Sequence, residues 1–289
     1  MQTLSEIKDL LSMAGHGPKK ALGQNFLFDH NLINKLIDAS GVRAGELVLE
    51  VGPGTGALTV AMLERGVRVI AVELDSGLAG VLQGTLCAQY PHQMTLIEGD
   101  CLATKRSMNV QTVGALGDEP FRLVANLPYH AATPLMIALM TRHPRCSGMF
   151  VTIQREVAQR FAASVGSKIY GTAGVIAQSL GRVEHIATLP PTCFWPRPEV
   201  TSAMMGWHRD DHPIAGENPQ WWPEMSDLTQ KLFMSRRKKI SFAIKKLAPG
   251  FDRYPESVSA DARVDELCPM QIDALCRSVH AARDSSGAG

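Results

Sequence analysis

Residues 46–60, "ELVLEVGPGTGALTV", decide the fold class of this 289-residue chain. The stretch begins with a short apolar run, passes through Gly52, Gly54 and Gly56, and continues with apolar residues at helical spacing. This order predicts a buried strand, a tight turn and a helix. Glycines let a ligand lie close to the backbone, and the helix start offers unpaired N–H groups. A plain strand-to-helix turn is the alternative interpretation.

The alternation of strands and helices continues beyond this stretch. Segments with helical spacing separate further apolar runs that show no apolar–polar alternation. Such strands indicate a parallel sheet that is covered on both faces. We therefore expect an α/β, doubly wound, Rossmann-like fold. The further strands are predicted at residues 67–75, 94–100, 121–129 and 148–154.

The pattern changes after residue 208. Residues 208–225 are polar and contain prolines, which favours a linker, whereas 226–247 and 264–282 have helical spacing. The sequence therefore predicts two domains, an α/β domain at 1–208 and a smaller all-α domain at 209–289.

The composition is that of an ordinary globular protein, with 45% hydrophobic residues, 20% charged residues and a formal net charge of +1. No apolar run approaches the roughly 18 residues of a membrane-spanning helix. The N-terminal residues form an amphipathic pattern whose Glu6 and Asp9 argue against a targeting peptide. Six scattered cysteines without a C-x-x-C pair favour reduced thiols in a cytoplasmic protein, and we expect no metal site. Residues 283–289 are predicted to be a disordered tail.

Two acids end the strands that follow the glycine turn. Glu73 closes the second strand about twenty positions after Gly52, where doubly wound folds place the acid that accepts hydrogen bonds from ribose hydroxyls. Asp100 follows the third strand, where it can accept a hydrogen bond from an adenine amino group. Solvated strand-end acids are the alternative. The turn and both acids indicate a site for an adenosine-bearing cofactor, leaving nicotinamide, flavin and S-adenosylmethionine (SAM) open.

The stretch "NLPY" at residues 126–129 favours one of these cofactors. The Asn126 side-chain oxygen and the Pro128 carbonyl would accept hydrogen bonds from both protons of an exocyclic nucleobase amine and aim its lone pair at an electrophile. Proline helps to fix the backbone, and Tyr129 offers a flat face on which an extruded base can stack. No charged general base is required if the electrophile is a sulfonium methyl group, which favours SAM. An Asx-type turn with an incidental tyrosine is the alternative.

Seven segments, taken in this order, resemble the bacterial rRNA adenine dimethyltransferases, which modify two adjacent adenines near the 3′ end of 16S rRNA. The resemblance covers about residues 19–247. It implies a SAM-dependent N6,N6-adenine dimethyltransferase that acts on small-subunit rRNA, or on an assembly intermediate of the 30S subunit, in the cytoplasm; we expect a monomer. The segments are "GQNFL" (23–27), "EVGPGTGALT" (50–59), "AVELD" (71–75), "GD" (99–100), "NLPY" (126–129), "FWPRPEVTS" (194–202) and "SRRKKI" (235–240).

The resemblance also implies roles for individual residues. Tyr129 and Phe194 would enclose the target adenine, so that the predicted catalytic group comprises Asn126, Pro128, Tyr129 and Phe194. Trp195 and Arg197 depart from the side chains expected between the prolines of "FWPRPEV". The predicted SAM-binding residues are Asn25, Leu27, Gly52, Gly54, Glu73, Asp100 and Asn126.

Residues 231–246, "KLFMSRRKKISFAIKK", contain seven basic residues and no acid. Apolar residues at helical spacing predict a helix with one packed face and one basic face. A solvated charged face is the alternative, but beside a base-modifying site we favour contacts with RNA phosphates. The smaller domain would then contact RNA. The predicted RNA-binding residues are Lys19, Lys20, Arg236, Arg237, Lys238 and Lys239.

The sequence leaves three alternative functions open. A nicotinamide-dependent oxidoreductase would share the glycine turn and Glu73 but gives no role to residues 126–129. A non-catalytic ribosome-assembly or transcription factor would keep the basic segment and would be expected to lose cofactor contacts. A related N6-adenine methylase would act on large-subunit rRNA or on DNA.

Overall fold

The computed structural model describes residues 2–287, and the chain divides into two compact units. The first unit comprises residues 1–139, 145–158 and 184–208, and the second comprises 140–144, 159–183 and 209–289. This division differs from the single boundary that the sequence suggests at residue 208. The reason is the helix α8 (Thr172–Leu180), which packs on α9 (Trp221–Phe233) and α11 (Pro269–Gly287).

The central sheet has seven strands in the order β4-β3-β2-β7-β8-β11-β9. Neighbouring strands from β4 to β8 are parallel, and β11 is antiparallel to β8. The predicted α/β fold is confirmed. The strand order reverses between β2 and β7, which is where doubly wound sheets open a crevice for ligands. The strands are β2 (Leu47–Val51), β3 (Arg68–Glu73), β4 (Met94–Glu98), β7 (Phe121–Asn126), β8 (Cys146–Gln154), β9 (Gly181–Leu189) and β11 (Ser202–Arg209).

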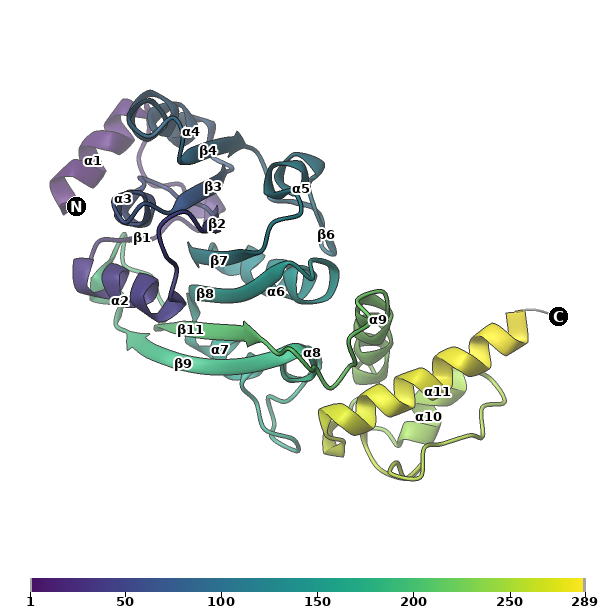
Figure 1. Ribbon diagram of the computed structural model, residues 1–289. Coiled ribbons are helices and arrows are strands. Elements are labelled where there is room, and N and C mark those ends of the chain that lie inside the picture. Colours follow the sequence, from purple (N-terminus) through teal and green to yellow (C-terminus); the bar gives the residue numbers. More distant parts are fainter. Residues whose placement is uncertain (1, 288–289) are drawn as a thin grey trace. The chain divides into compact units, whose positions relative to one another are not determined.

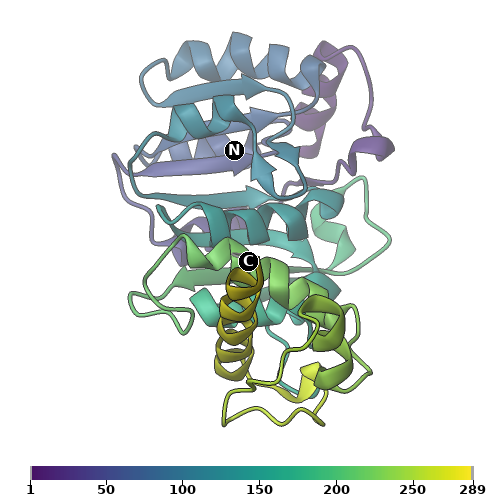
Figure 2. The ribbon, with the colours of Figure 1, turned by 90° about the vertical axis from the view of Figure 1, so that its right-hand side faces the viewer.

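Helices cover both faces of this sheet (Figure 1). The helices α2 (His30–Ser40) and α3 (Ala57–Leu63) lie on one face, and α5 (Val110–Leu116) and α6 (Tyr129–Arg142) lie on the other. Figure 2 looks onto the face with α5 and α6. Covering both faces explains why the interior strands are almost continuously apolar. The remaining elements of the first unit are α1 (Leu4–Met13), β1 (Phe26–Leu27), α4 (Ser76–Leu82), β5 (Leu102–Thr104), β6 (Ser107–Met108), and β10 (Phe194–Trp195); α7 (Arg155–Phe161) spans the boundary at residue 158.

The core of the first unit lies between the sheet and α2 and α3. Leu36, Val48 and Met62 are completely buried there, and Phe194 joins the same cluster. Among the described residues, no helix is long and apolar enough to cross a membrane.

The second unit is mostly helical, with α8, α9, α10 (Ile240–Leu247) and α11. Trp221 and Trp222 are buried at the start of α9, so the predicted linker is wrong from residue 221 onward. The reason is tertiary: the Trp221 indole donates a hydrogen bond to Asp273 at 2.6 Å, and the Trp222 indole donates to the Gly216 carbonyl at 2.9 Å. The disordered tail is also wrong in part, because α11 continues to Gly287; residues 288–289 lie outside the described residues.

Candidate active site

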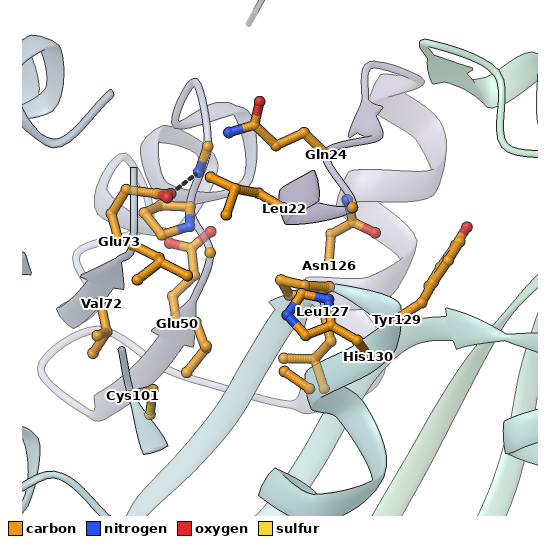
Figure 3. A pocket seen from close by; sticks show the side chains of 18 of the residues that line it. Leu22, Gln24, Glu50, Val72, Glu73, Cys101, Asn126, Leu127, Tyr129 and His130 are labelled. Carbon is orange, nitrogen blue, oxygen red and sulfur yellow. Dashed lines mark hydrogen bonds between the residues drawn. The ribbon is translucent and has the colours of Figure 1, made fainter. Parts of the chain in front are cut away.

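A cavity of about 420 Å³ opens at the carboxyl ends of β2, β3, β4 and β7. It lies at the reversal of strand order, and its size is typical of small-molecule sites. One wall is the glycine turn after β2, and the opposite wall is the segment after β7 (Figure 3). Residues 22–27 of the N-terminal segment also line it.

The glycine turn requires glycine for two reasons. Gly52 and Gly54 have φ angles of 74° and 60°, a region that other residues rarely adopt. A Cβ atom at Gly54 would lie 2.9 Å from the Phe26 ring, and one at Gly52 would lie 3.3 Å from the Pro128 ring. The turn is therefore a close-fitting backbone cradle beside the cavity.

Glu73 ends β3 beside this turn and is 5% exposed. Its carboxylate accepts a hydrogen bond from the backbone N–H group of Gly54 at 2.9 Å (Figure 3), and another from that of Asp75, also at 2.9 Å. Burial raises the pKa of Glu73, and the backbone hydrogen bonds oppose that effect. A carboxylate offers about four acceptor sites, so two remain for hydroxyl groups of a ligand.

Glu50 is a cavity residue that the sequence interpretation missed. It is 1% exposed within β2 and accepts a hydrogen bond from the Thr59 hydroxyl at 2.7 Å. Burial raises its pKa to about 8, and the nearby Glu73 acts in the same direction. The available signal was an acid inside an otherwise apolar buried strand, where an acid is costly to bury.

Asn126 lies across the cavity from Glu73 (Figure 3). Its Nδ2 donates a hydrogen bond to the Asn25 carbonyl at 2.9 Å, and Asn25 in turn donates to the Gly23 carbonyl at 3.1 Å. The amide nitrogen of Asn126 is thereby engaged, and its oxygen is turned toward the Tyr129 side (Figure 3). The N-terminal segment thus orients the side chain at the end of β7 and leaves an acceptor available.

The Pro128 carbonyl takes part in the first turn of α6. It accepts hydrogen bonds from the N–H groups of Ala131 at 3.0 Å and Ala132 at 3.2 Å, because α6 begins directly after it. The carbonyl is therefore already engaged inside the protein, and its contact with a substrate amine stays a prediction. The Pro128 ring still lines the cavity against Gly52. Among the described residues, no hydrogen bond is formed to the neighbouring Leu127 carbonyl.

Only one of the two predicted stacking rings lies at the cavity. Tyr129 lines it, and its hydroxyl forms a 2.7 Å hydrogen bond with the Ser202 hydroxyl. Burial raises the pKa of Tyr129. Phe194 is 1% exposed, pairs with Leu27 between β10 and β1, and is absent from the cavity lining. The pairing of these two short strands holds the Phe194 ring in the core.

The remaining predicted cofactor residues line the cavity. Asn25 and Leu27 do so from the N-terminal segment. Asp100 follows β4, and one of its carboxylate oxygens accepts a hydrogen bond from the Leu102 N–H at 2.8 Å. Its side chain is exposed, so acceptor sites remain.

Lys19 forms an ion pair with a buried acid, Asp75. Its Nζ donates to Asp75 at 2.9 Å, and the same carboxylate receives His16 at 2.9 Å and Gln24 at 2.8 Å. Burial alone would raise the pKa of Asp75, but these hydrogen bonds lower it to about 2. The ion pair uses one of the three N–H donors of Lys19, whose side chain is 40% exposed, and Lys20 is exposed as well. The RNA contacts of both residues stay predictions.

The basic segment of the second unit is not one helix. Residues 234–239 form a turn between α9 and α10, and Arg236 within this turn is partly buried. Its guanidinium forms an ion pair with Asp265 at 3.0 Å and donates to the carbonyls of Ser167 and Lys168 at 2.7 and 2.6 Å. Its guanidinium is therefore engaged inside the protein, and the RNA contact of Arg236 stays a prediction. Arg237, Lys238 and Lys239 are exposed, and Lys239 pairs with the exposed Asp261 at 2.8 Å.

Comparison with protein families identifies the family of this chain. Residues 15–279 match the family "Ribosomal RNA adenine dimethylase". The chain belongs to this family. It is therefore a SAM-dependent, rRNA-modifying methyltransferase. The glycine cradle, the available acceptors of Glu73 and Asp100, and the cavity size fit that cofactor.

Relatives of known name agree with this assignment. The chain is 38% identical over 239 residues to "Ribosomal RNA small subunit methyltransferase A" of Leifsonia xyli subsp. xyli, which covers 82% of this chain and 81% of the relative. It is 35% identical over 298 residues to the protein of the same name from Bifidobacterium longum subsp. infantis, with coverage of 98% and 95%.

Two solved structures share the fold. A dimethyladenosine transferase from Plasmodium falciparum has a TM-score of 0.67 at 20% identity, covering 91% of this chain and 98% of that chain. The 23S rRNA methyltransferase ErmE has a TM-score of 0.64 at 22% identity, covering 89% of this chain and 100% of that chain. At these identities the likeness concerns the fold alone.

Proposed function

We propose that this family member dimethylates N6 of two adjacent adenines near the 3′ end of 16S rRNA during ribosome biogenesis. The names of the bacterial relatives support the small subunit as the substrate. The observation that carries the chemistry is the Asn126 amide, which is held by the Asn25 carbonyl and keeps its oxygen available at the cavity. This arrangement suits an amine donor and gives a nicotinamide-dependent hydride transfer no use for Asn126.

The cofactor would lie along the sheet edge. Glu73 would accept hydrogen bonds from its ribose hydroxyls, and Asp100 would accept one from its adenine amino group. Gly52 and Gly54 admit it close to the backbone, and Asn25 and Leu27 border it from the N-terminal segment. When bound, SAM supplies an electrophilic methyl group on its sulfonium.

The chain's own residues prepare the amine. The Asn126 oxygen accepts a hydrogen bond from one N6 proton, and the Leu127 carbonyl, the acceptor left open beside it, replaces Pro128 as the partner of the other. These bonds favour a pyramidal nitrogen, whose lone pair is no longer delocalised into the ring. The first transfer breaks the bond between the methyl group and sulfur and leaves a cationic nitrogen, which must release one proton to solvent. The methylated amine then has one proton left, and one of the two acceptors can hold it during a second transfer.

Tyr129 would supply the stacking face for the extruded adenine, because its hydroxyl is anchored to Ser202. Phe194 would have to leave the pairing of β10 with β1 to join it. We further propose that the enzyme works as a monomer and that it works in the cytoplasm, which its six free cysteines support. Arg237, Lys238, Lys239 and Lys20 are the proposed phosphate contacts.

The test is methyl transfer from radiolabelled SAM to small subunits isolated from cells that lack this enzyme. We expect N6,N6-dimethyladenosine at two adjacent positions of 16S rRNA and none in large subunits. Label in large subunits alone would reject the proposal in favour of the related large-subunit methylase.

Asn126→Ala should lower turnover by roughly a hundredfold, the usual loss for one preorganised polar group at a reacting centre. SAM affinity, which calorimetry would measure, should fall much less than turnover, because the main contact of the side chain is with the reacting amine. Near-wild-type turnover would remove Asn126 from the mechanism.

A further inference from the structure

An aromatic ring stands exposed within a cationic surface of the second unit. Phe242 on α10 is 45% exposed. The Nζ atom of Lys246 lies 4.9 Å from the centroid of its ring, and that of Lys238 lies 6.0 Å away. Lys246 approaches the ring from the same helix and Lys238 from the turn before it, and we call these three side chains the stripe. The buried side chains of the same helix are those of Ile240, Ala243 and Ile244.

This stripe continues into a shallow concavity of about 600 Å³ at the turn between α9 and α10. Lys238 belongs to both features. The concavity is also lined by Lys168, Arg237 and Arg263 and by the acid Asp265, which is paired with Arg236. The charge of the surface is therefore strongly positive.

Arg236 shapes the concavity. Its three hydrogen-bonded partners are Asp265 and the carbonyls of Ser167 and Lys168. These bonds hold residues 167–168 beside the turn and bring the Lys168 side chain to the same surface as Arg237. Arg236 is thus a positioning residue, and the exposed cations around it remain available to a ligand.

The combination of charges and ring selects among ligands. Exposed lysines and arginines attract phosphate groups, and an aromatic face that is accessible between cations suits an unstacked nucleobase. A continuous duplex keeps its bases stacked on one another and therefore offers no free base to stack on the Phe242 ring. An acidic protein segment would match the charge but would require only an apolar contact at Phe242.

We propose that this surface binds an unpaired segment of rRNA, with one base stacked on Phe242 between Lys238 and Lys246 and neighbouring phosphates on Arg237 and Lys168. The proposal rests on the proposed function, because it assumes an rRNA substrate. It adds a second base contact, on residues that belong wholly to the helical unit and lie outside the cofactor cavity.

The experiment compares full-length wild type with Phe242→Ala, Phe242→Leu and Phe242→Trp. The probe is the small subunit from cells that lack the enzyme, titrated at several KCl concentrations, followed by methylation kinetics. Phe242→Ala and Phe242→Leu should each weaken binding by about tenfold, the lower range for loss of one stacked base, and Phe242→Trp should bind like wild type. KM should rise with kcat unchanged, and the slope of log affinity against log salt should stay constant because no cation is removed.

Several results would overturn the proposal. If Phe242→Ala bound small subunits with wild-type affinity, the lysine–ring contacts would serve only to stabilise α10. Wild-type affinity of Phe242→Leu for small subunits would indicate an apolar protein contact. A parallel titration uses vesicles of anionic phospholipid. If Phe242→Ala bound small subunits like wild type but bound these vesicles more weakly, the surface would contact a membrane. If wild type failed to methylate small subunits, the proposed function would fall; if wild type methylated them while Phe242→Ala bound normally, only this inference would fall.

Discussion

Replacing Asp75 with asparagine should destabilise the fold at neutral pH and weaken SAM binding. Asp75 caps α4 and receives side-chain hydrogen bonds from Lys19, His16 and Gln24 while its side chain is fully buried. Asparagine caps helices about as well as aspartate, so the change removes the charge and keeps the shape and the cap. The segment that Asp75 holds also carries Asn25, whose carbonyl orients Asn126.

The magnitude follows from the pKa of Asp75, which falls from its ordinary 3.8 to about 2. One pKa unit corresponds to about 1.4 kcal/mol, so the charged form contributes about 2.5 kcal/mol to the free energy of unfolding. Because the folded-state pKa is the lower one, this contribution is complete above about pH 4 and is lost as the pH falls through about 2.

Urea denaturation of wild type and Asp75→Asn between pH 3 and pH 8 measures the effect. The two proteins should differ by about 2.5 kcal/mol at pH 7, and the difference should shrink to roughly half of that at pH 3, on its way to zero below about pH 2. The matched control is Asp29→Asn, because Asp29 caps α2 through Asn31 and Leu32. Asp29→Asn should lower the free energy of unfolding only slightly. Calorimetry should show weaker SAM binding for Asp75→Asn than for this control. Equal stability of the two variants at pH 7 would refute the reasoning.

Three further predictions concern single residues. Glu73→Ala should weaken SAM binding by about 1.5–3 kcal/mol in calorimetry, the usual loss of hydrogen bonds to a charged group, and unchanged affinity in a folded variant would remove it from the ribose role. Because the Glu50 pKa of about 8 lies above its ordinary 4.5, wild type should lose unfolding free energy as the pH rises from about 4.5 to 8. Glu50→Gln should flatten that decline in urea titrations, and an equal decline in both proteins would contradict it. Arg236→Ala should lower the melting temperature, because it removes the contacts with Asp265 and residues 167–168. Arg237→Ala should keep the melting temperature and lower the salt slope of subunit binding by somewhat less than one unit. A lower salt slope for Arg236→Ala at an unchanged melting temperature would instead make Arg236 itself a phosphate contact.

The sequence alone determined the α/β fold and the edge of the sheet at which the cavity opens. The reason is that both depend on local patterns: apolar strands without alternation, a glycine turn, and acids at strand ends. Glu73, Asp100 and Asn126 all lie where a carboxyl-edge site requires them, since parallel strands bring their ends to one edge. The family resemblance was confirmed by the match over residues 15–279.

The tertiary structure decided which polar groups are available. Sequence patterns show that Lys19 and Arg236 are basic, but only contacts with Asp75 and Asp265 show that both are engaged inside the protein. The start of α6 decides the use of the Pro128 carbonyl, because the first turn of a helix takes up the carbonyl before it. Glu50 and the Asn25–Asn126 hydrogen bond were equally hidden, since residues distant in the chain meet only when the sheet and the N-terminal segment close the cavity.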